Sequence, residues 1–422
     1  MYGVQSSGAL VRAQRALFGK RETRIPQTVV LLGLCSLLTD ISSEMVTTVL
    51  PLYLVAALGF TPLQYGIVDG IYQGGAAIMR LLAGYFGDRW RRHKEVAMAG
   101  YGLSAICKLA LALIGSAFGA IGAVILADRT GKGIRTAPRD AMISLSTPKE
   151  RLGASFGVHR AMDTAGAMIG PLLAFALLAF APGAFHSLFL VSFCFAIAGF
   201  GVLALLVNDP SRRARGDAPP VAERVHLRAA LGLLRRRGFR GLTLTASLLG
   251  LATASDGFIY LILQDRLALD SALFPLLATG TAVTFMLLAA PIGRIADHVG
   301  RGKVFIAGYA VLLAVYGLLL IPGAGLPGLL VILALLGAYY AATDGVLMAL
   351  GSPHVPDHLR GSGLALLGTA TSVARLLASV LFGALWTVFG IRPAIAVFGV
   401  VLVGAMIVAA AAVRRAEHDL AG

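Results

Sequence analysis

Charged side chains recur inside the most apolar parts of this sequence, where an unpaired charge is costly. The densest group lies in the apolar block 119–146. At about 100° per residue on one helix, its charges fall within an arc of about 140°. These charges are Asp128, Arg129, Lys132, Arg135, Arg139 and Asp140. One face of the predicted helix is therefore charged, and it must contact protein or water rather than lipid.

A second, narrower polar stripe follows in the next apolar block. His159, Asp163, Gly166 and Gly170 fall within about 60° of one another by the same arithmetic. We interpret the two polar faces as one wall of a pathway through a membrane. His159 beside Asp163 is also typical of a hydrogen-bonded packing residue. Soft-metal binding through His159 and Met162 is only weakly indicated, because no second such pair lies nearby, and no metal site is predicted.

The composition indicates that these helices belong to a membrane protein. Hydrophobic residues make up 57% of the 422 residues and charged residues 14%, against about a quarter charged in soluble proteins. Apolar blocks of roughly 20 residues, the length that crosses a bilayer, recur along the chain. The predicted fold class is an all-α membrane protein with twelve transmembrane helices. The blocks are 28–57, 62–86, 95–115, 119–146, 154–180, 187–207, 241–263, 273–293, 304–322, 327–350, 362–389 and 393–413.

The net charge of +15 does not indicate a nucleic-acid partner, because the basic residues are unevenly distributed. With both termini in the cytoplasm, most of the 36 lysines and arginines fall in cytoplasmic segments and eight fall inside the helices. Only Arg266 and Arg392 fall in loops on the outer side of the membrane. This asymmetry predicts a multi-pass protein of the cell's inner membrane. The first 26 residues are basic without a sustained apolar run, which predicts a cytoplasmic tail rather than a signal peptide.

Landmarks in the first half of the chain recur in the second half. Asp40 in the first block corresponds to Asp256 in the seventh, and Asp140 in the fourth corresponds to Asp344 in the tenth. Two pseudo-symmetric six-helix halves are typical of transporters built from repeats around a midplane site. The predicted domains are the tail 1–27, the bundle 28–208, the basic linker 209–240, the bundle 241–413 and the tail 414–422.

A loop motif closes the second block and is repeated after the eighth. The first copy has Gly84, Asp88, Arg89 and Arg92, and Arg91 departs from the pattern. The second copy has the residues Gly293, Asp297, Gly300 and Arg301. Over essentially its whole length the chain resembles the major facilitator superfamily, whose loop signature is G-x-x-x-D-[RK]-x-G-[RK]-[RK], with glycine where this chain has Arg91.

Two further motifs refine this resemblance. Arg129, followed by Lys132 and Gly133, is similar to the family's fourth-helix motif, whose arginine is associated with proton coupling. The fifth helix resembles the antiporter motif of the drug:proton exchanging branch, although Ala174 and Phe175 replace its closing glycine pair. The residues of that motif are Gly157, Gly166, Gly170 and Pro171. The resemblance implies that its glycines serve packing between the two halves.

The motif residues and buried charges divide into predicted roles, with static pairing as the alternative for many of the charges. Proton coupling is assigned to Asp40, Glu44, Arg129 and Asp256. Substrate binding or cavity lining is assigned to Lys108, Lys132, Arg135, His159, Arg160, Asp163 and Arg375. Gating is assigned to Gly84, Asp88, Arg89, Arg92, Arg139, Asp140, Gly293, Asp297, Gly300, Arg301 and Asp344. Helix packing is assigned to Gly157, Gly166, Gly170 and Pro171.

Specific contacts follow from these roles. We expect Asp40 or Glu44 to pair with Arg129 when deprotonated and to release it when protonated. Asp88 and Arg89 are expected to pair with Arg139 or Asp140 as a latch of the outward-open state. Asp69 is expected near the outer surface, in water. Tyrosines that could line a cavity, or simply pack, are Tyr53, Tyr72, Tyr260, Tyr339 and Tyr340.

The function predicted from these patterns is proton-driven export of a small organic or drug-like compound by alternating access. One alternative is import or exchange of an organic anion, with the cations of block 119–146 as clamps. Another is a membrane receptor that does not transport. No Walker loop, HExxH, GxSxG or Cys/His cluster occurs in the sequence, so neither an enzyme nor a cofactor is predicted. The expected partners are a small-molecule substrate, protons and membrane lipid, with no nucleic acid, and the chain is expected to be a monomer.

Overall fold

The structure is a computed structural model that describes residues 25–90, 92–209, 231–323, 325–356 and 359–421. Side chains are described for these residues apart from 78, 80–90, 149, 360 and 413–421. Within this part of the chain every regular element is a helix. The tail before residue 25 and most of the predicted linker lie outside the described residues.

Ten helical segments of the described chain are long and apolar enough to cross a membrane. Two of them end in π-helical turns, Tyr53–Ala57 after α2 and Val202–Leu206 after α7, and α9 and α10 form one segment. The helices of these segments are α2 (Gln27–Leu52), α4 (His93–Leu113), α6 (Leu152–Phe180), α7 (Phe185–Gly201), α9 (Arg237–Leu251), α10 (Asp256–Leu267), α11 (Phe274–Val299), α12 (Arg301–Leu320), α13 (Gly325–Gly351), α14 (Arg360–Phe389) and α15 (Ile391–Ala421).

Two more long helices lie among them. They are α3 (Pro62–Trp90) and α5 (Phe118–Leu145), of 29 and 28 residues. Short 3-10 turns occur at Lys149–Arg151, Leu233–Arg235, Ser271–Leu273 and Ser352–His354. Each apolar block predicted from the sequence overlaps one of these elements, or the pair α9 and α10.

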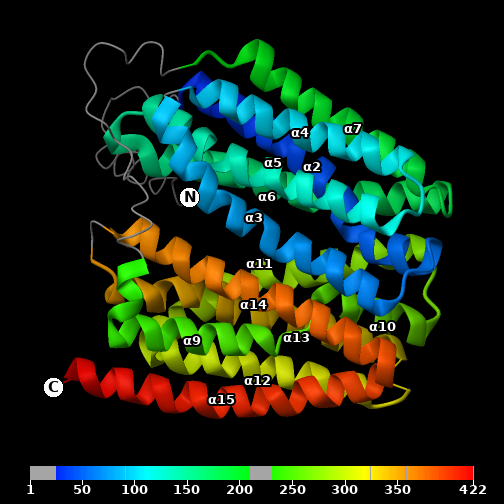
Figure 1. The fold of residues 1–422 in the computed structure, drawn as a ribbon, viewed down its shortest axis with the longest axis vertical. Coiled ribbons are helices and arrows are strands. Elements are labelled where there is room, and N and C mark those ends of the chain that lie inside the picture. The colour runs from blue at the N-terminus through cyan, green and yellow to red at the C-terminus, as the bar shows by residue number, and fades with distance from the viewer. Residues whose placement is uncertain (1–24, 91, 210–230, 324, 357–358, 422) are drawn as a thin grey trace, which may run out of the picture.

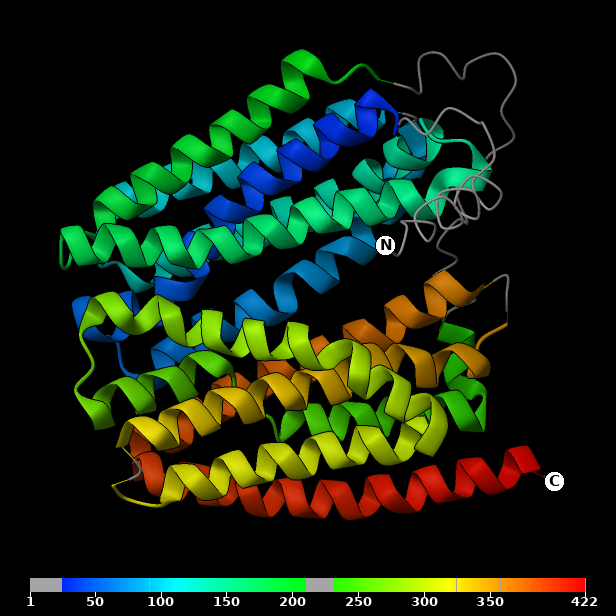
Figure 2. The same ribbon diagram turned by 180° about the vertical axis from the view of Figure 1, so that it is seen from behind.

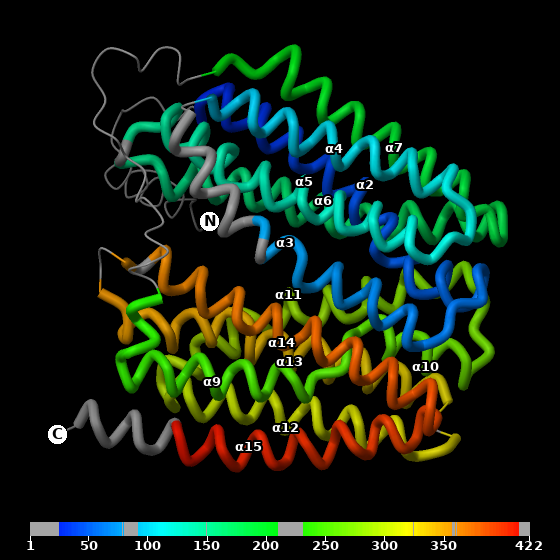
Figure 3. Tube along the Cα trace, viewed as in Figure 1, coloured from blue at the N-terminus to red at the C-terminus, as the bar shows by residue number. Residues whose placement is uncertain are grey.

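The helices gather in two groups that lie side by side (Figure 1). Helices α2 and α4 to α7 form one group, and α9 to α15 form the other. Helix α3 runs between them and packs against both α5 and α14, while α6 faces α11 on the other side (Figures 1 and 2). The tube in Figure 3 shows that the π-helical turn Val202–Leu206 ends, and α9 begins, at the same end of the bundle, which we call the linker end. The loops before α3 and α11 lie at the opposite end.

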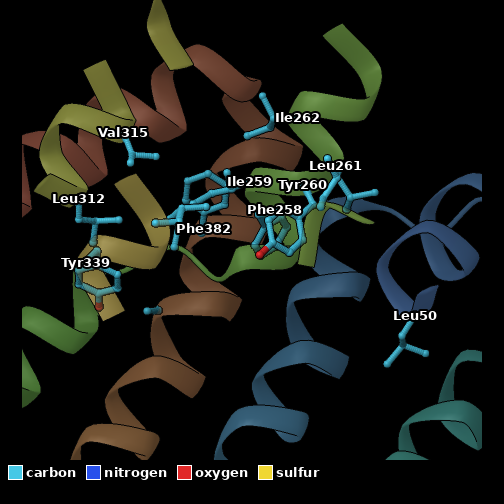
Figure 4. Packing of buried hydrophobic residues seen from close by; sticks show 14 of the residues in the cluster. Leu50, Phe258, Ile259, Tyr260, Leu261, Ile262, Leu312, Val315, Tyr339 and Phe382 are labelled. Carbon is cyan, nitrogen blue, oxygen red and sulfur yellow. The ribbon is translucent and has the colours of Figure 1, made fainter. Parts of the chain in front are cut away.

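Apolar side chains fill the interior and also cover the outside. Phe258 of α10 and Phe382 of α14 lie beside each other in the core, with ring centroids 4.8 Å apart (Figure 4). On the outer face of α15, Val400 and Ile407 are 73% and 67% exposed. Exposed apolar surface of this kind suits a lipid environment, because lipid tails are as apolar as these side chains.

The predicted helix at 241–263 is interrupted, and this is a correction to the sequence analysis. Helix α9 ends at Leu251 and α10 begins at Asp256. Tyr316 of α12 satisfies the backbone of the break, because its hydroxyl accepts from the Ala254 N–H at 2.7 Å and donates to the Ala252 carbonyl oxygen at 3.0 Å. Irregular backbone inside a membrane protein needs such partners from neighbouring helices.

The glycines of the fifth-helix motif pack within one group of helices rather than between the two groups, which corrects the expectation taken from the family. A β-carbon at Gly166 would lie 2.5 Å from the Leu37 carbonyl oxygen of α2. A β-carbon at Gly170 would lie 2.8 Å from the Ile41 carbonyl oxygen. Gly157 has no such neighbour within 4 Å. Only two of the three glycines therefore permit the close contact between α6 and α2.

Candidate functional site

A cavity of about 300 Å³, here called the central cavity, lies between the two groups of helices. Its walls come from α2 and α3 on one side and from α10, α11 and α13 on the other. The charged side chains that line it are all acidic: Glu44, Asp69, Asp256 and Asp344. Among the described lining residues there is no lysine, arginine or histidine. The cavity therefore has a negative electrostatic character wherever these groups are ionised.

Hydroxyl, amide and aromatic groups complete the wall of the central cavity. The Tyr340 hydroxyl donates to Asp256 Oδ1 at 2.7 Å, and the Tyr260 hydroxyl donates to Thr281 Oγ1 at 2.9 Å. Thr47 and Tyr72 are hydrogen-bonded to each other through their hydroxyls. The remaining polar or aromatic lining residues are Thr48, Tyr65, Gln73 and Phe285. A lining that combines carboxylates with aromatic side chains suits an organic cation, which can form both ion pairs and cation–π contacts.

A second cavity of about 490 Å³ adjoins the first toward the linker end, and Gln73 and Asp344 line both. Its wall includes Arg375 on α14, whose Nη2 lies 3.4 Å from Asp344 Oδ1. Thr371 and Ser372 of the same helix line it as well. The two cavities together extend from the middle of the bundle toward the ends of α13 and α14 at the linker end.

The opposite end is closed where α3 meets α14. A β-carbon at Gly66 would lie 2.5 Å from the Ser379 carbonyl oxygen, so the two backbones are in close contact. The Leu63 N–H donates to Thr387 Oγ1 at 2.9 Å. The Asp69 side chain, expected in water, is 8% exposed and accepts a hydrogen bond of 2.7 Å from the Ser379 hydroxyl. The expectation for Asp69 is wrong because α14 covers it, which no property of its own helix could reveal.

A buried cluster outside the described lining of both cavities joins Asp128 and Arg129 of α5 to Lys108 of α4. Asp128 bridges two cations: Lys108 Nζ lies 2.7 Å from its Oδ1, and Arg129 Nε donates to its Oδ2 at 3.1 Å. All three residues are at most 3% exposed. The Arg129 guanidinium also stacks on Tyr72, 3.9 Å from the ring centroid. The expected pairing of Arg129 with Asp40 or Glu44 is not what the structure contains, because the adjacent Asp128 is its ion-pair partner.

Asp40 pairs instead with Arg135, which lies six residues after Arg129 on α5. Arg135 Nη2 lies 3.8 Å from Asp40 Oδ1, and its guanidinium stacks on Tyr101 at 4.4 Å from the ring centroid. Arg135 Nη1 is buried without a hydrogen-bond partner among the described residues. A carboxylate of α2 thus does face an arginine of α5, but the arginine is Arg135.

A further polar group joins α2, α5 and α6 near the linker end. Arg139 Nε donates to Asp140 Oδ1 at 3.0 Å, and Arg139 Nη1 lies 3.9 Å from Asp163 Oδ1. Ser36 accepts a bond from Arg139 at 3.2 Å and bonds to His159 Nε2 at 3.0 Å. His159 is 4% exposed, in agreement with the packing alternative for this residue.

The structure brings only part of the predicted substrate site to the cavities. Arg375 lines the second cavity, but the other six predicted residues are absent from the described lining of both. Lys108 and Arg135 are held in the contacts described above, and the Arg160 side chain is 79% exposed beside Asp163. Lys132 is partly buried on α5, outside the described lining. The helical spacing of the charges therefore predicted that α5 has a polar face, but not which residues or cavities that face contacts.

The gating residues are partly visible. Arg301 Nη2 lies 2.8 Å from Asp297 Oδ1, and Arg301 Nη1 donates to the Ala349 carbonyl oxygen of α13 at 3.2 Å. Gly300 has a φ of 111°, which favours glycine between α11 and α12. Gly293 is open, with no atom within 4 Å of a β-carbon there. The predicted latch involves Asp88 and Arg89, whose side chains are outside the described ones, as is Gly84 of the same motif. Arg92 is described and exposed.

Sequence reasoning missed Tyr65, Gln73 and Phe285 as lining residues. Gln73 carries a detectable signal, because an amide inside an apolar helix is expensive unless it meets protein or water. Of the tyrosines considered, Tyr72, Tyr260 and Tyr340 line the central cavity, whereas Tyr53 and Tyr339 are outside its described lining. In the described part of the chain, no group of three or more His, Cys, Asp or Glu side chains is arranged to hold a metal ion.

Comparison with known proteins identifies the family. The model of the Major Facilitator Superfamily matches residues 32–274 and 242–422. The chain belongs to the Major Facilitator Superfamily. An uncharacterised MFS-type transporter of Methanocaldococcus jannaschii is 31% identical over 379 residues, which cover 87% of this chain and 91% of that protein. An uncharacterised protein of Mycobacterium tuberculosis is 34% identical over 157 residues, covering 37% of this chain and 38% of that protein.

Solved structures share the fold of this superfamily member. The nucleoside transporter NupG matches with a TM-score of 0.75 at 16% identity, over 92% of this chain and 98% of that one. A bacterial homologue of the human lysosomal transporter Spinster, inward-facing and unoccupied, matches with a TM-score of 0.74 at 14% identity, over 93% and 97%. At these identities the likeness establishes the fold only. The family and the structural relatives are transporters, not enzymes, so this is a multi-pass membrane protein with the fold of a small-molecule transporter.

Proposed function

We propose that the protein exchanges protons for a small organic cation by alternating access, in the direction of export. In this proposal α3 and α5 also cross the membrane, which gives twelve crossings in two six-helix halves, 28–208 and 241–413. The linker 209–240 and the tails 1–27 and 414–422 lie in the cytoplasm, and the protein works as a monomer in the inner membrane. Helices α3 and α5 are long enough for this, and their charges have protein contacts where they are described.

The observation that carries the proposal is the acidic lining of the central cavity. Asp256 has a tyrosine hydroxyl as its partner rather than a cation, and Glu44 lies across the cavity from it on α2. Such a carboxylate can be neutralised either by a proton or by a bound cation, but not by both at once. Competition for the same group links the two species, which is what an exchanger requires.

The organic-anion alternative receives less support. It relied on the cations of α5, and of these Arg129 and Arg135 are buried against Asp128 and Asp40. An anionic substrate that bound these arginines would have to displace the two carboxylates first, which would leave the carboxylates buried and unpaired. The direction of transport rests on the antiporter motif of the fifth helix, whose Gly166 and Gly170 hold α6 tightly on α2.

The test uses cells stripped of their own exporters and three fluorescent compounds of similar size, one cationic, one neutral and one anionic. We expect wild type to lower the accumulation of the cationic compound alone, and an uncoupler to abolish the effect. Glu44→Gln should lose it too, while Asp265→Asn, an exposed carboxylate on α10, should retain it at equal expression. Selective movement of the anionic compound would support the alternative, and binding without movement of any compound would indicate a receptor.

A further inference from the structure

Asp69 is a buried acid at the contact between the two groups of helices, and no cation of the described part of the chain forms an ion pair with it. It belongs to α3, it is 8% exposed, and Ser379 of α14 lies 2.7 Å from its Oδ2. Among the described residues no lysine, arginine or histidine forms an ion pair with it. The nearest arginine along α14 is Arg375, one turn before Ser379, and it pairs with Asp344 instead.

The groups that face Asp69 from every packed element are neutral or acidic. Its own helix contributes Tyr65 and Gln73, and the start of α10 contributes Ser255 and Asp256. From α14 it receives only the Ser379 hydroxyl. A charged carboxylate in this setting has no compensating cation, and a second carboxylate nearby adds repulsion. A bound proton removes both costs, because the neutral acid can still hydrogen-bond to Ser379.

The position of Asp69 connects it to a movement. The contact of α3 with α14 closes the opposite end of the bundle, and its tightness depends on glycines: a β-carbon at Gly70 would lie 2.9 Å from the Leu376 carbonyl oxygen. Opening the protein to the other side of the membrane requires these two helices to separate. Asp69 would then meet water from that side, whereas in the closed arrangement it lines the central cavity. It can thus exchange a proton with each side in turn.

We propose that Asp69 is the proton-operated latch of the gate formed by α3 and α14. In the open gate the carboxylate takes a proton from the outside water, and the neutral acid then allows α3 and α14 to close over it. In the closed gate that proton leaves to water in the central cavity, and the resulting unpaired carboxylate drives the helices apart. This inference rests on the proposed proton exchange, and it adds Asp69 as a second proton site beside the carboxylate for which proton and cation compete.

The test measures the gate itself rather than transport. The exposed native Cys194 is first replaced by serine. Spin labels are then attached to cysteines introduced at two exposed positions of the opposite end, Ala57→Cys before α3 and Val388→Cys on α14. Pulsed electron resonance of the full chain in lipid nanodiscs gives the distance between the labels in acidic and alkaline buffer. In wild type we expect the short-distance population to grow as the pH falls.

Three variants separate the latch from other causes. Asp69→Asn mimics the neutral acid, so it should keep the short distance at every pH. Ser379→Ala removes the partner across the gate, so it should shift the population toward long distances. Asp265→Asn should behave as wild type. A pH response that persists in Asp69→Asn, or a wild type without any response, would overturn the latch. If the latch is observed but transport is not proton-driven, the proposed function fails and the gate assignment remains.

Discussion

At the scale of residues, Lys108, Asp128 and Arg129 form a buried ion-pair cluster. One carboxylate sits between two cations, and all three are shielded from water and lipid. Removing the shared partner of a buried ion pair typically costs about 3–5 kcal/mol, because uncompensated charge is left behind. The cluster therefore fixes α4 against α5 and turns Arg129 onto Tyr72 at the edge of the cavity.

We predict that Asp128→Asn lowers the free energy of unfolding by about 3–5 kcal/mol. The matched control is Asp297→Asn, which breaks the ion pair of Asp297 with Arg301. The two side chains of this pair are 59% and 42% exposed, so the substitution should lower the free energy of unfolding by no more than about 1 kcal/mol. Thermal unfolding of the purified variants in the same detergent compares them. Equal losses for the two variants would show that the α5 cluster does not stabilise the fold.

The sequence predicted that these residues are polar, buried and on one face, but not which pairs form. Asp128 and Arg129 are neighbours in the chain, and side chains of successive residues on a helix do not face each other. Their side chains meet because the long guanidinium can turn back to the carboxylate. Partners such as Arg135 for Asp40, or Ser379 for Asp69, depend on how separate helices are placed. The relative positions of the helices cannot be read from the residue spacing within each helix.

At the scale of elements, the packing of α6 on α2 depends on two glycines of the fifth-helix motif. The contact brings Gly166 and Gly170 against the α2 backbone beside Leu37 and Ile41. The resemblance to the family motif predicted that these glycines serve helix packing. The sequence did not identify the partner helix. The break between α9 and α10 was also missed, because the segment has no proline and only the short run of small and polar residues 252–257 interrupts its apolar residues.

We predict that Gly166→Ala costs about 1–3 kcal/mol of stability, since its methyl group would overlap the Leu37 carbonyl oxygen unless the helices shift. Gly157→Ala changes a glycine of the same motif with no atom within 4 Å, so it should be neutral or slightly stabilising. The yield of monodisperse protein after heating distinguishes them. Comparable losses in both variants would show that the close contact of Gly166 with α2 does not set the effect.

At the scale of the whole molecule, the family fold could be predicted from the sequence because apolar blocks, basic loops and motif residues all point to it. The central cavity could be predicted only in part. Glu44 and Asp256 were identified as deep carboxylates, whereas Gln73 and Tyr65 were not identified at all. A cavity is formed by several helices together, so its lining depends on their relative positions more than on any one helix.

The most direct test of the account is proton movement coupled to an organic cation. Purified protein in liposomes that enclose a pH-sensitive dye is given an acidic interior, and a cationic compound is added outside. We predict that wild type exports protons as the cation enters, so the interior becomes more alkaline, and that Asp256→Asn does not do so while Asp265→Asn does. Cation movement without any change in interior pH, or an unchanged response in Asp256→Asn, would contradict proton and cation competition in the central cavity.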